Sequence, residues 1–331
     1  MNAPVVSILG AGGWGTALAV LCADRGMKVN LWGYAAEQVA KLREARANER
    51  YLPGVKLGEQ ILPTNDLQGC ASADVIFFVT PSKAIRVVAE QFSKFQVPAG
   101  TPLVSCTKGI EHEGGLRMSE VLREYFPANP IGALSGPNHA EEVARRMPAA
   151  AVVAFADLVV AERLQPLLST PYFRAYTTDD VAGVELGGAL KNIYAIAAGV
   201  SDGLGFGDNS KAALETRALV ELVRLGVELG GRRETFYGLS GMGDLMVTCF
   251  SRHSRNRGLG ERLGRGESLE QITARMSGIA EGVPTTRSAF ECARRMNVST
   301  PIIDQVHAML FEGKPPRTAL VELMSRDRRA E

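Results

Sequence analysis

Residues 5–20 read VVSILGAGGWGTALAV and contain the part of the sequence that decides the fold. Val5–Leu9 is a short apolar run, largely β-branched, which predicts a buried strand. Residues 10–15, GAGGWG, follow at once and fit the spacing G-x-G-x-x-G. Residues 16–24 then have an apolar helical pattern, and Lys28–Trp32 has the composition of a second strand. This order of strand, glycine turn, helix and strand is the context that a dinucleotide-binding fingerprint requires.

The glycines of this turn have separate physical roles. Gly10 allows a tight turn after the strand, and Gly12 lets the backbone approach a pyrophosphate closely. Gly15 lets the helix pack against the strand. The free N–H groups of the helix N-terminus attract phosphate. We therefore expect this turn to bind a dinucleotide, through Gly10, Gly12, Gly13, Trp14 and Gly15; the alternative is a glycine-rich turn without a ligand.

The alternation of strands and helices continues to about residue 178. It predicts a mostly parallel sheet that is covered by helices on both faces. Ligands of such sheets gather at the carboxyl ends of the strands, where Lys108 and residues 136–138 lie. The expected strands are 74–80, 102–105, 131–134 and 149–155, and the expected helices are 84–95, 118–125 and 140–146.

Beyond residue 178 the strand signals end and helical periods replace them. A chain of 331 residues is too long for one ordinary core. We therefore expect a Rossmann-type dinucleotide-binding domain at residues 1–178 and an all-helical substrate or catalytic domain at residues 179–331. The expected helices of the second domain are 184–200, 211–229, 257–265, 269–276, 285–296, 302–311 and 318–325.

Lys191 and Asn192 lie in the middle of VELGGALKNIYAIAAGV, residues 184–200, where nearly every other position is apolar or small. A lysine buried in such a helix is unfavourable unless it is paired or has a chemical task. Burial lowers the pKa of an ammonium group and prepares it to exchange a proton near neutral pH. The alternative is a lysine that extends along its own stem to the surface. The small residues 187–189 favour a task, because they leave room for a ligand or another backbone.

Two loops expected in the helical half carry polar groups. Residues 238–244, GLSGMGD, end in an acid that either has a chemical role or caps the next helix. Residues 251–257, SRHSRNR, contain three arginines, whose guanidinium groups match phosphate oxygens. A solvated basic loop is the alternative. A small phosphorylated substrate fits better than nucleic acid, because the net charge is +1 and no aromatic residues alternate with the arginines.

Composition limits the class of protein further. The sequence is 46% hydrophobic and 22% charged, as in soluble globular proteins. Its five cysteines lack C-x-x-C spacing and its four histidines lack an H-x-x-x-H pair, so we expect reduced thiols and no metal. No apolar run reaches transmembrane length, and no signal-peptide pattern opens the sequence. We expect a cytoplasmic protein without stable membrane insertion.

Motifs in both halves resemble those of one family, in the same order. They are GAGGWGTALA from residue 10, TKG at 107–109, SGP at 135–137, ELGGALKN at 185–192, GMGDL at 241–245, SRNR at 254–257 and EG at 281–282. The chain resembles the soluble bacterial NAD(P)-dependent sn-glycerol-3-phosphate dehydrogenases over nearly its whole length. The resemblance implies a Rossmann-type domain and an all-α C-terminal domain similar to that of 6-phosphogluconate dehydrogenase.

The same resemblance implies an activity and the residues that carry it out. Dihydroxyacetone phosphate and sn-glycerol 3-phosphate would be interconverted with NADPH or NADH, for phospholipid synthesis, and a homodimer is compatible with it. Lys191 would be the proton donor and acceptor. The substrate would contact Lys108, Gly136, Asn138, Lys191, Asp244, Ser254, Arg255 and Asn256; the family often has Ser or Thr at position 138. The dinucleotide would contact Gly10, Gly12, Gly13, Trp14, Gly15, Tyr34, Lys108, Ala140, Arg255, Ile279 and Glu281; position 34 varies in the family.

Asp244 is placed in this scheme to hold Lys191. A close carboxylate would raise the pKa of the lysine, whereas burial and a nearby Lys108 would lower it. Two other functions stay open at this point. One is a β-hydroxyacid dehydrogenase of the 6-phosphogluconate type, which turnover of phosphogluconate instead of dihydroxyacetone phosphate would indicate. The other is a dinucleotide-binding sensor without catalysis, against which the buried lysine argues.

The end of the second strand, residues 31–34, bears on the choice of cofactor. NAD-specific sites have an acid about 20 residues after the glycine turn, which binds the ribose 2′-hydroxyl. Here the first acid is Glu37, and Arg46 or Arg50 would approach a 2′-phosphate only if the loop folds back. We predict that both cofactors are accepted, with a moderate preference for NADPH. A carboxylate at position 33 is expected to shift that preference towards NADH.

Overall fold

The computed structural model describes residues 3–112, 114–276 and 278–325. It divides into two compact units. Unit 1 comprises the residues up to Lys108 together with Arg117–Glu185, and unit 2 comprises Gly109–Leu116 and the residues from Leu186 onward. The sequence pattern puts the division after residue 178, whereas the structure puts it seven residues later, inside helix α7 (Val181–Gly203).

Unit 1 contains the strands and helices of the first half of the chain. Its strands are β1 (Val5–Leu9), β2 (Lys28–Trp32), β3 (Ala47–Asn48), β4 (Leu52–Lys56), β5 (Ile61–Thr64), β6 (Val75–Phe78), β7 (Leu103–Ser105), β8 (Ile131–Ser135), β9 (Ala149–Phe155) and β10 (Phe173–Thr178). Its helices are α1 (Gly13–Asp24), α2 (Ala36–Ala45), α3 (Ile85–Phe92), α4 (Met118–Tyr125), α5 (Ala140–Ala144) and α6 (Leu158–Leu168).

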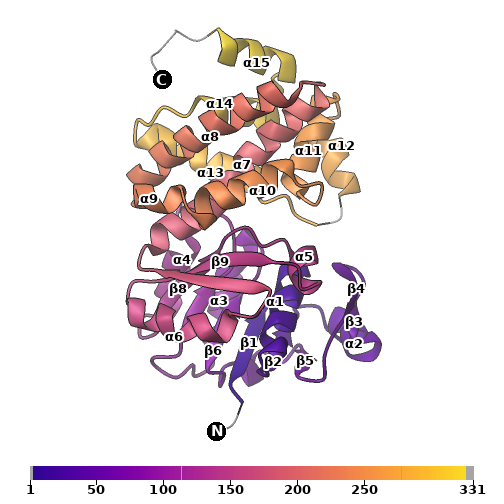
Figure 1. The fold of residues 1–331 in the computed structure, drawn as a ribbon, viewed down its shortest axis with the longest axis vertical. Helices are drawn as coiled ribbons and strands as arrows, with labels where there is room; N and C mark the ends of the chain where they lie inside the picture. Colours follow the sequence, from indigo (N-terminus) through magenta and orange to yellow (C-terminus); the bar gives the residue numbers. More distant parts are fainter. Residues whose placement is uncertain (1–2, 113, 277, 326–331) are drawn as a thin grey trace. The chain divides into compact units, whose positions relative to one another are not determined.

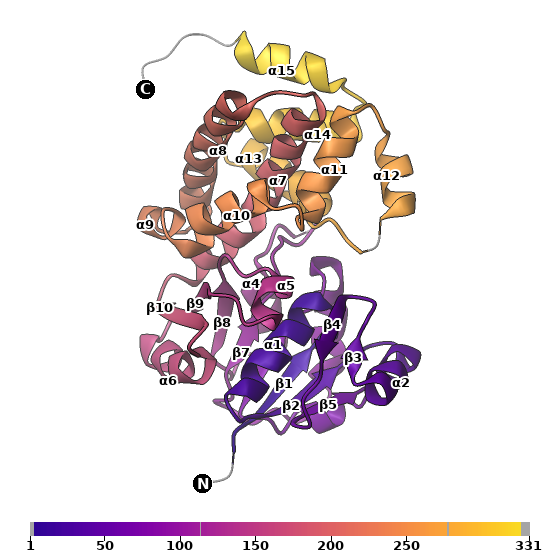
Figure 2. The same ribbon diagram turned by 45° about the vertical axis from the view of Figure 1, so that its right-hand side comes forward.

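The main sheet of unit 1 has eight strands in the order β10-β9-β8-β7-β6-β1-β2-β5. Neighbouring strands are parallel except for β8 and β9. Helices α1, α5 and α6 cover one face and α3 and α4 the other (Figures 1 and 2). The predicted parallel sheet between two layers of helices is therefore confirmed. β1 and β6 are neighbours in the sheet, but the strand that follows β1, β2, lies on one side of this pair and the strand that follows β6, β7, lies on the other. At such a switch point α/β proteins bind ligands.

Of the strands absent from the sequence prediction, β3 and β4 form a separate two-stranded sheet, and β5 and β10 lie at the edges of the main sheet. β5 and β10 are the two outermost strands of the main sheet. β5 contains Pro63, which cannot donate to a ladder and suits an edge. β10 alternates buried and exposed residues and ends in two threonines. Edge strands of this composition lack the continuous apolar signal of a central parallel strand.

Unit 2 is mostly helical, as expected. Its helices, beside the larger part of α7, are α8 (Asp208–Glu228), α9 (Arg233–Phe236), α10 (Asp244–Phe250), α11 (Arg255–Gly264), α12 (Leu269–Arg275), α13 (Gly282–Arg295), α14 (Pro301–Phe311) and α15 (Pro316–Met324). A π-helical turn, η3 (Leu239–Gly243), leads into α10. In the part of the chain that the structure describes, none of the helices has both the length and the apolar composition needed to span a bilayer.

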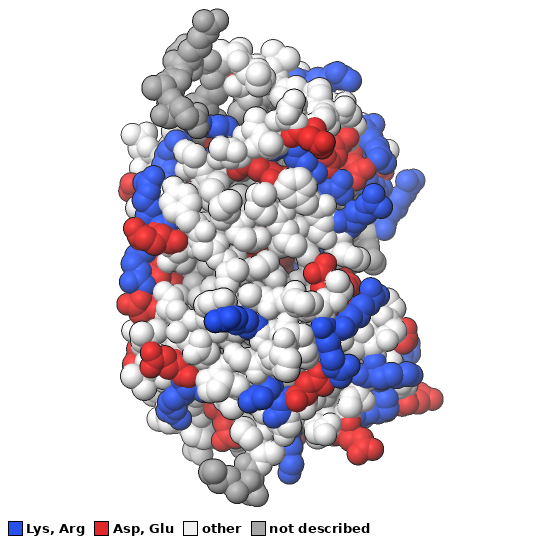
Figure 3. Space-filling model, in the orientation of Figure 1, with Lys and Arg blue, Asp and Glu red and all other residues white. Residues whose placement is uncertain are grey.

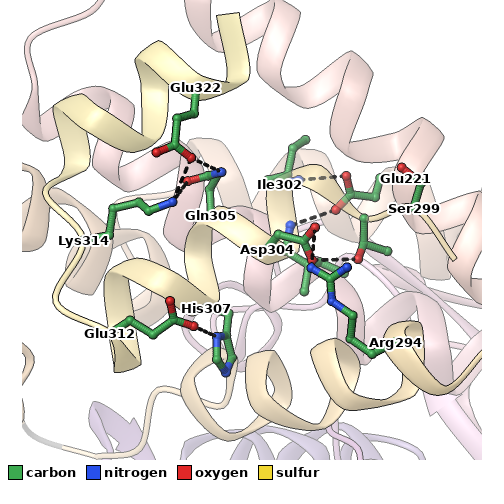
Figure 4. Close-up of polar contacts among 12 residues, drawn as sticks. Glu221, Arg294, Ser299, Ile302, Asp304, Gln305, His307, Glu312, Lys314 and Glu322 are labelled. Atoms are coloured by element: carbon green, nitrogen blue, oxygen red, sulfur yellow. Dashed lines mark hydrogen bonds and ion pairs between the residues drawn. The ribbon is translucent and has the colours of Figure 1, made fainter. Parts of the chain in front are cut away.

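The N-terminus of α14 is held by a side chain from another helix. Both oxygens of Glu221, on α8, accept backbone N–H groups, from Ile302 and Ile303 at 2.9 Å each (Figure 4). Thr300 at the N-cap supplies no side-chain hydrogen bond to the backbone. Burial raises the pKa of the Glu221 carboxyl to about 7, although the two N–H donors oppose the change. Glu221 therefore takes the place of a local cap.

A cluster of charged side chains joins α7, α8 and α11. Asp202 accepts hydrogen bonds from Lys211 Nζ at 3.0 and 2.9 Å and pairs with Arg257 Nη2 at 2.6 Å. Glu215, one turn after Lys211, is only 5% exposed, and its Oε1 has no hydrogen-bond partner among the described residues. Burial raises the pKa of Glu215 to about 7, against the influence of Lys211.

Glu215→Gln should become more stable relative to the wild type as the pH rises from 5 to 8. The folded protein holds the Glu215 proton up to about pH 7, above the ordinary pKa of 4.5. The stabilisation from this carboxyl is therefore complete below pH 4.5 and is lost as the pH rises through 7, whereas glutamine stays neutral. We expect the difference in unfolding free energy, measured with urea, to change by about 1–3 kcal/mol over that range.

The matched control is Glu228→Gln, an exposed residue of the same helix, for which no such change is expected. If the Glu215→Gln and wild-type stabilities ran parallel from pH 5 to 8, Glu215 would have to be ionised in the folded protein throughout.

Candidate functional site

The glycine turn lies between β1 and α1. Gly10 has a φ of +136°, and a Cβ at this position would lie 2.4 Å from the carbonyl oxygen of Val79. A Cβ at Gly15 would lie 1.8 Å from the carbonyl oxygen of Gly10. No real Cβ contact is that short, so both positions require glycine. The tight turn and the close packing of α1 on the end of the strand follow from this.

The N-terminus of α1 suits a pyrophosphate. No side chain caps it, and a Cβ built on its N-cap residue, Gly12, would have no atom within 4 Å. The first N–H groups of a helix have no partner inside the helix, and the helix dipole favours an anion there. The residues present therefore fit a dinucleotide.

Two polar residues that the sequence analysis did not single out hold this turn. The carbonyl oxygen of Ala11 accepts hydrogen bonds from Gln38 Nε2 at 2.9 Å and from Asn48 Nδ2 at 3.1 Å. Asn48 is buried and also donates to Thr16 Oγ1 at 2.7 Å. The segment after α2 therefore folds back onto the glycine turn. No local pattern marks either residue in the sequence.

The remaining dinucleotide candidates of unit 1 lie at different places around the turn. The Cβ of Ala140, the first residue of α5, would lie 3.7 Å from a Cβ at Gly13. Trp14 packs partly buried against the core of unit 1. Tyr34, two residues after β2, is 78% exposed and meets Trp32 edge-on. Ala140 is thus beside the turn, whereas the Tyr34 ring stands in solvent.

Lys108 gathers the polar groups that follow two neighbouring strands. Its Nζ donates to the carbonyl oxygen of Gly136 at 3.0 Å and to Asn138 Oδ1 at 2.9 Å. Gly136 has a φ of +141°, and a Cβ there would lie 2.9 Å from Ala151 Cα. The buried Nδ2 of Asn138 has no hydrogen-bond partner in the described part of the chain, so it is a donor available to a ligand. The structure therefore brings Lys108, Gly136 and Asn138 together in one group.

Lys191 is buried in unit 2 and paired. Its Nζ donates to Asp244 Oδ1 and, at 2.6 Å, to Thr248 Oγ1. Lys191 is 4% exposed and Asp244 1% exposed. Thr248 in turn donates to the carbonyl oxygen of Asp244 at 2.6 Å. The interpretation as a lysine that extends to the surface is therefore wrong. Thr248, one helical turn after Asp244, is a third member that the sequence analysis missed.

The backbone brings Asp244 to Lys191 through a close approach at Gly187. A Cβ on Gly187, one turn before Lys191, would lie 2.5 Å from the carbonyl oxygen of Ser240. Residues 239–243, expected as part of a loop, form the π-helical turn η3, and Asp244 is the first residue of the helix that follows. The small residues before Lys191 are expected to leave room either for a ligand or for another backbone. Gly187 leaves room for the backbone of Ser240.

Glu185, the first residue of the ELGGALKN motif, has its partners in unit 1. Its carboxylate accepts hydrogen bonds from the Ser119 backbone N–H at 2.8 Å and from the Ser119 hydroxyl at 2.5 Å. It also pairs with Arg117 Nη1 at 3.2 Å. These groups lie at the N-terminus of α4, so Glu185 anchors the start of α7 on that helix end.

Ser254 and Asn256 organise the start of α11. Ser254 is the N-cap and its Oγ accepts the backbone N–H of Arg257 at 3.2 Å. The Asn256 side chain donates to Asn192 Oδ1 and accepts the backbone N–H of Gly282, both at 2.9 Å. Asn256 therefore ties α11 to α7, next to Lys191, and to the start of α13.

The arginines of SRHSRNR separate from one another. Arg255 lies against Gly278, where a Cβ would be 2.7 Å from Nη1, so it stands beside the segment that contains Ile279 and Glu281. Arg252 is exposed. Arg257 pairs with Asp202 at 2.6 Å and with Glu261 at 3.5 Å. The expectation that all three arginines share one anion site is therefore wrong for Arg257, whose charge is already compensated.

The charge on one face of the molecule is mixed. On the face drawn in Figure 3, basic side chains of the described residues stand among acidic ones. Nucleic acids bind continuous basic tracks instead.

Residues 3–112, 114–276 and 278–325 contain no group of three or more His, Cys, Asp or Glu that would hold a metal ion.

Comparison with known proteins identifies the family. Residues 5–161 match the N-terminal model, and residues 180–321 the C-terminal model, of NAD-dependent glycerol-3-phosphate dehydrogenase. Glycerol-3-phosphate dehydrogenase (NAD(P)+) of Geobacter sp. (strain M21) is 46% identical over 330 residues, 98% of either chain. The Moorella thermoacetica protein of the same name is 47% identical and covers 98% of this chain and 97% of its own.

Among solved structures, glycerol-3-phosphate dehydrogenase from Coxiella burnetii is 37% identical. It superposes with a TM-score of 0.94 over 98% of this chain and 99% of its own. Both halves of the sequence, with the glycine turn in one and the buried lysine in the other, thus match the same proteins. The chain belongs to the family of NAD-dependent glycerol-3-phosphate dehydrogenases.

Proposed function

We propose that this protein interconverts dihydroxyacetone phosphate and sn-glycerol 3-phosphate with NADPH or NADH, and so supplies phospholipid synthesis. The observation that carries the proposal is the buried group of Lys191, Asp244 and Thr248 in a chain of this family. A binding protein without catalysis has no use for an ammonium group held in this way. The names of the relatives favour glycerol-3-phosphate over 6-phosphogluconate chemistry.

Lys191 is the proposed proton donor and acceptor. Bound nicotinamide dinucleotide supplies the hydride in one direction and accepts it in the other. Lys191 gives a proton to the carbonyl oxygen during reduction and takes it from the hydroxyl during oxidation. Its positive charge polarises the carbonyl beforehand. Asp244 and Thr248 hold Nζ, so that the lysine meets the substrate in one orientation.

The phosphate of the substrate is proposed to bind Arg255, whose planar guanidinium matches phosphate oxygens. Ser254 and Asn256 flank it, and Asn256 is tied to the helix of Lys191. In unit 1, the free donor of Asn138 and the Lys108 ammonium suit the oxygens of the same substrate. Binding energy from the phosphate would position the reacting carbon.

The dinucleotide is proposed to lie on the glycine turn, with its pyrophosphate at the N-terminus of α1. The open space at Gly12 and the uncapped helix end support this. The proposed contacts are Gly10, Gly12, Gly13, Trp14, Gly15, Tyr34, Lys108 and Ala140 from unit 1 and Arg255, Ile279 and Glu281 from unit 2.

The direct test is to mix purified protein, NADPH and dihydroxyacetone phosphate and to follow the loss of NADPH absorbance. We expect consumption that depends on the ketone, and sn-glycerol 3-phosphate as the product. NADPH binding without turnover of this or any other ketone would indicate a sensor. Turnover of 6-phosphogluconate alone would indicate the related dehydrogenase. We further propose a cytoplasmic location and a homodimer. Sedimentation of the purified protein tests the homodimer, and fractionation of cells that contain the protein tests the location.

Cofactor choice is proposed to depend on the residues that follow β2. A carboxylate at position 33 is a poor test, because a Cβ at Gly33 would lie 2.9 Å from Val39 Cγ2 and strain the turn. Arg46 is engaged with the carbonyl oxygens of Leu57, Gly58 and Ile61. Arg50, stacked on Tyr51, lies in the segment that folds back onto the turn. This favours Arg50 as the partner of a 2′-phosphate.

Tyr34→Asp should shift the preference from NADPH towards NADH. A carboxylate at this exposed position repels a 2′-phosphate and accepts a hydrogen bond from a 2′-hydroxyl. We expect the ratio of kcat/KM for NADPH to that for NADH to fall about tenfold or more. Tyr34→Asn, of the same size but neutral, is the control and should change the ratio much less. Equal ratios for the aspartate variant and the wild type would refute a role of this strand end.

A further inference from the structure

Helices α7 and α11 approach each other at the level of their backbones. A Cβ on Gly199 of α7 would lie 2.0 Å from the carbonyl oxygen of Arg257, and one on Gly203 would lie 2.2 Å from that of Glu261. A Cβ on Gly260 of α11 would lie 2.0 Å from the carbonyl oxygen of Ile196. One turn later, a Cβ on Gly264 would lie 2.6 Å from the carbonyl oxygen of Val200. Each helix thus presents two glycines spaced by four residues, which lie on one face.

These two helices carry the chemical groups proposed for opposite ends of the substrate. Lys191 lies on α7, about two turns before Gly199. Arg255 is the first residue of α11, and Ser254 is its N-cap. The glycine contact therefore fixes how close the phosphate-binding arginine comes to the helix that carries the proton donor.

An ion pair between Arg257 and Asp202 also joins α11 to α7. Arg257, two residues after Arg255, pairs with Asp202 of α7, and both side chains are largely buried. Lys211 of α8 donates two hydrogen bonds to the same carboxylate. Glycines by themselves provide no directional contact along the crossing. The Arg257–Asp202 pair supplies one near the C-terminal end of α7, in addition to the Asn256–Asn192 hydrogen bond beside Lys191, and so helps to hold α11 in one register.

We propose that Arg257 and Asp202 are positioning residues, which set the phosphate-binding group of Arg255 at a fixed distance from Lys191. This rests on the proposed function of Lys191 and Arg255. Neither Arg257 nor Asp202 touches the substrate; they act through the placement of α11. Their loss should therefore affect phosphorylated substrates above all.

The experiment compares Arg257→Met and Arg257→Lys with the wild type. The control is Arg265→Met, on the same helix, whose side chain is 63% exposed and pairs with Glu261. We measure kcat and KM for dihydroxyacetone phosphate and for unphosphorylated dihydroxyacetone at saturating NADPH. A misplacement of about 1 Å can reduce a rate by about 100-fold.

For Arg257→Met we expect kcat/KM for the phosphate ester to fall at least about tenfold, mainly through KM, and kcat/KM for dihydroxyacetone to stay within about twofold. Arg257→Lys, which keeps the charge but loses the planar fork, should recover part of the loss. Arg265→Met should behave as the wild type. Should the Met variant fail to fold, the Lys variant decides by the same comparison.

Equal losses with both ketones would overturn the proposal in favour of a general structural role, and so would variants that behave as the wild type. If the wild type itself does not reduce dihydroxyacetone phosphate, the proposed function fails. In that case the affinity for sn-glycerol 3-phosphate, measured by calorimetry, tests separately whether Arg257 positions Arg255. Weaker binding by Arg257→Lys than by Arg265→Met supports it, and equal binding overturns it.

Discussion

Lys191→Met should reduce turnover of dihydroxyacetone phosphate by about 10²–10⁴-fold while the Kd for NADPH stays within about twofold of the wild type. The variant removes Nζ of Lys191, which donates hydrogen bonds to Asp244 and Thr248. Methionine keeps most of the side-chain volume but cannot donate a proton. The measurement is kcat under saturating NADPH, with NADPH binding followed by fluorescence.

Folding has to be controlled, because the variant leaves the buried Asp244 without its cation, and breaking such a pair can cost about 3–5 kcal/mol. Lys191→Met combined with Asp244→Asn removes the uncompensated charge and should fold while remaining inactive. Lys314→Met, which breaks the ion pair with Glu322 on α15, should leave kcat unchanged. More than about a tenth of the wild-type rate in the first variant, with NADPH bound, would mean that another group moves the proton.

Arg255→Ala should weaken the use of dihydroxyacetone phosphate by about 10–150-fold in kcat/KM, equivalent to about 1.5–3 kcal/mol for a hydrogen bond to a charged group. Unphosphorylated dihydroxyacetone, a poor substrate from the outset, should lose much less, because it has no phosphate to bind. The matched control is Arg252→Ala, an exposed arginine of the same segment. Equal losses for both ketones would place the effect on the cofactor or on the fold.

Much of unit 1 could be predicted because its central strands are short, apolar and separated by recognisable turns. The glycine turn is determined locally, by contacts that only glycine at positions 10 and 15 permits. The edge strands β5 and β10 could not be predicted, because their pairing depends on neighbours far away in the sequence and their residues lack a continuous apolar signal. The inclusion of Gly109–Leu116 in unit 2 likewise depends on tertiary contacts.

In the candidate site, too, some residues could be predicted from the sequence and others could not. Lys191 stands out because a lysine in an apolar helix needs an explanation, and Asp244 because an acid ends a glycine-rich stretch. Thr248 and Asn48 give no such signal, since threonine and asparagine are common and only their distant partners reveal their roles. Arg257 looks like Arg255 in the sequence, and the carboxylate that compensates it lies on another helix.

The glycine contact between α7 and α11 has a consequence for how this protein tolerates change. At Gly199, Gly203, Gly260 and Gly264 the neighbouring atoms are backbone carbonyls, which cannot change rotamer to make room. Every codon that replaces one of these glycines adds at least a methyl group at a point without space. A library of random variants selected for growth should therefore retain glycine at these four positions, while exposed positions elsewhere in unit 2, such as Glu228, diversify. Engineers who wish to change the substrate would do better to leave this crossing intact and vary the surrounding loops.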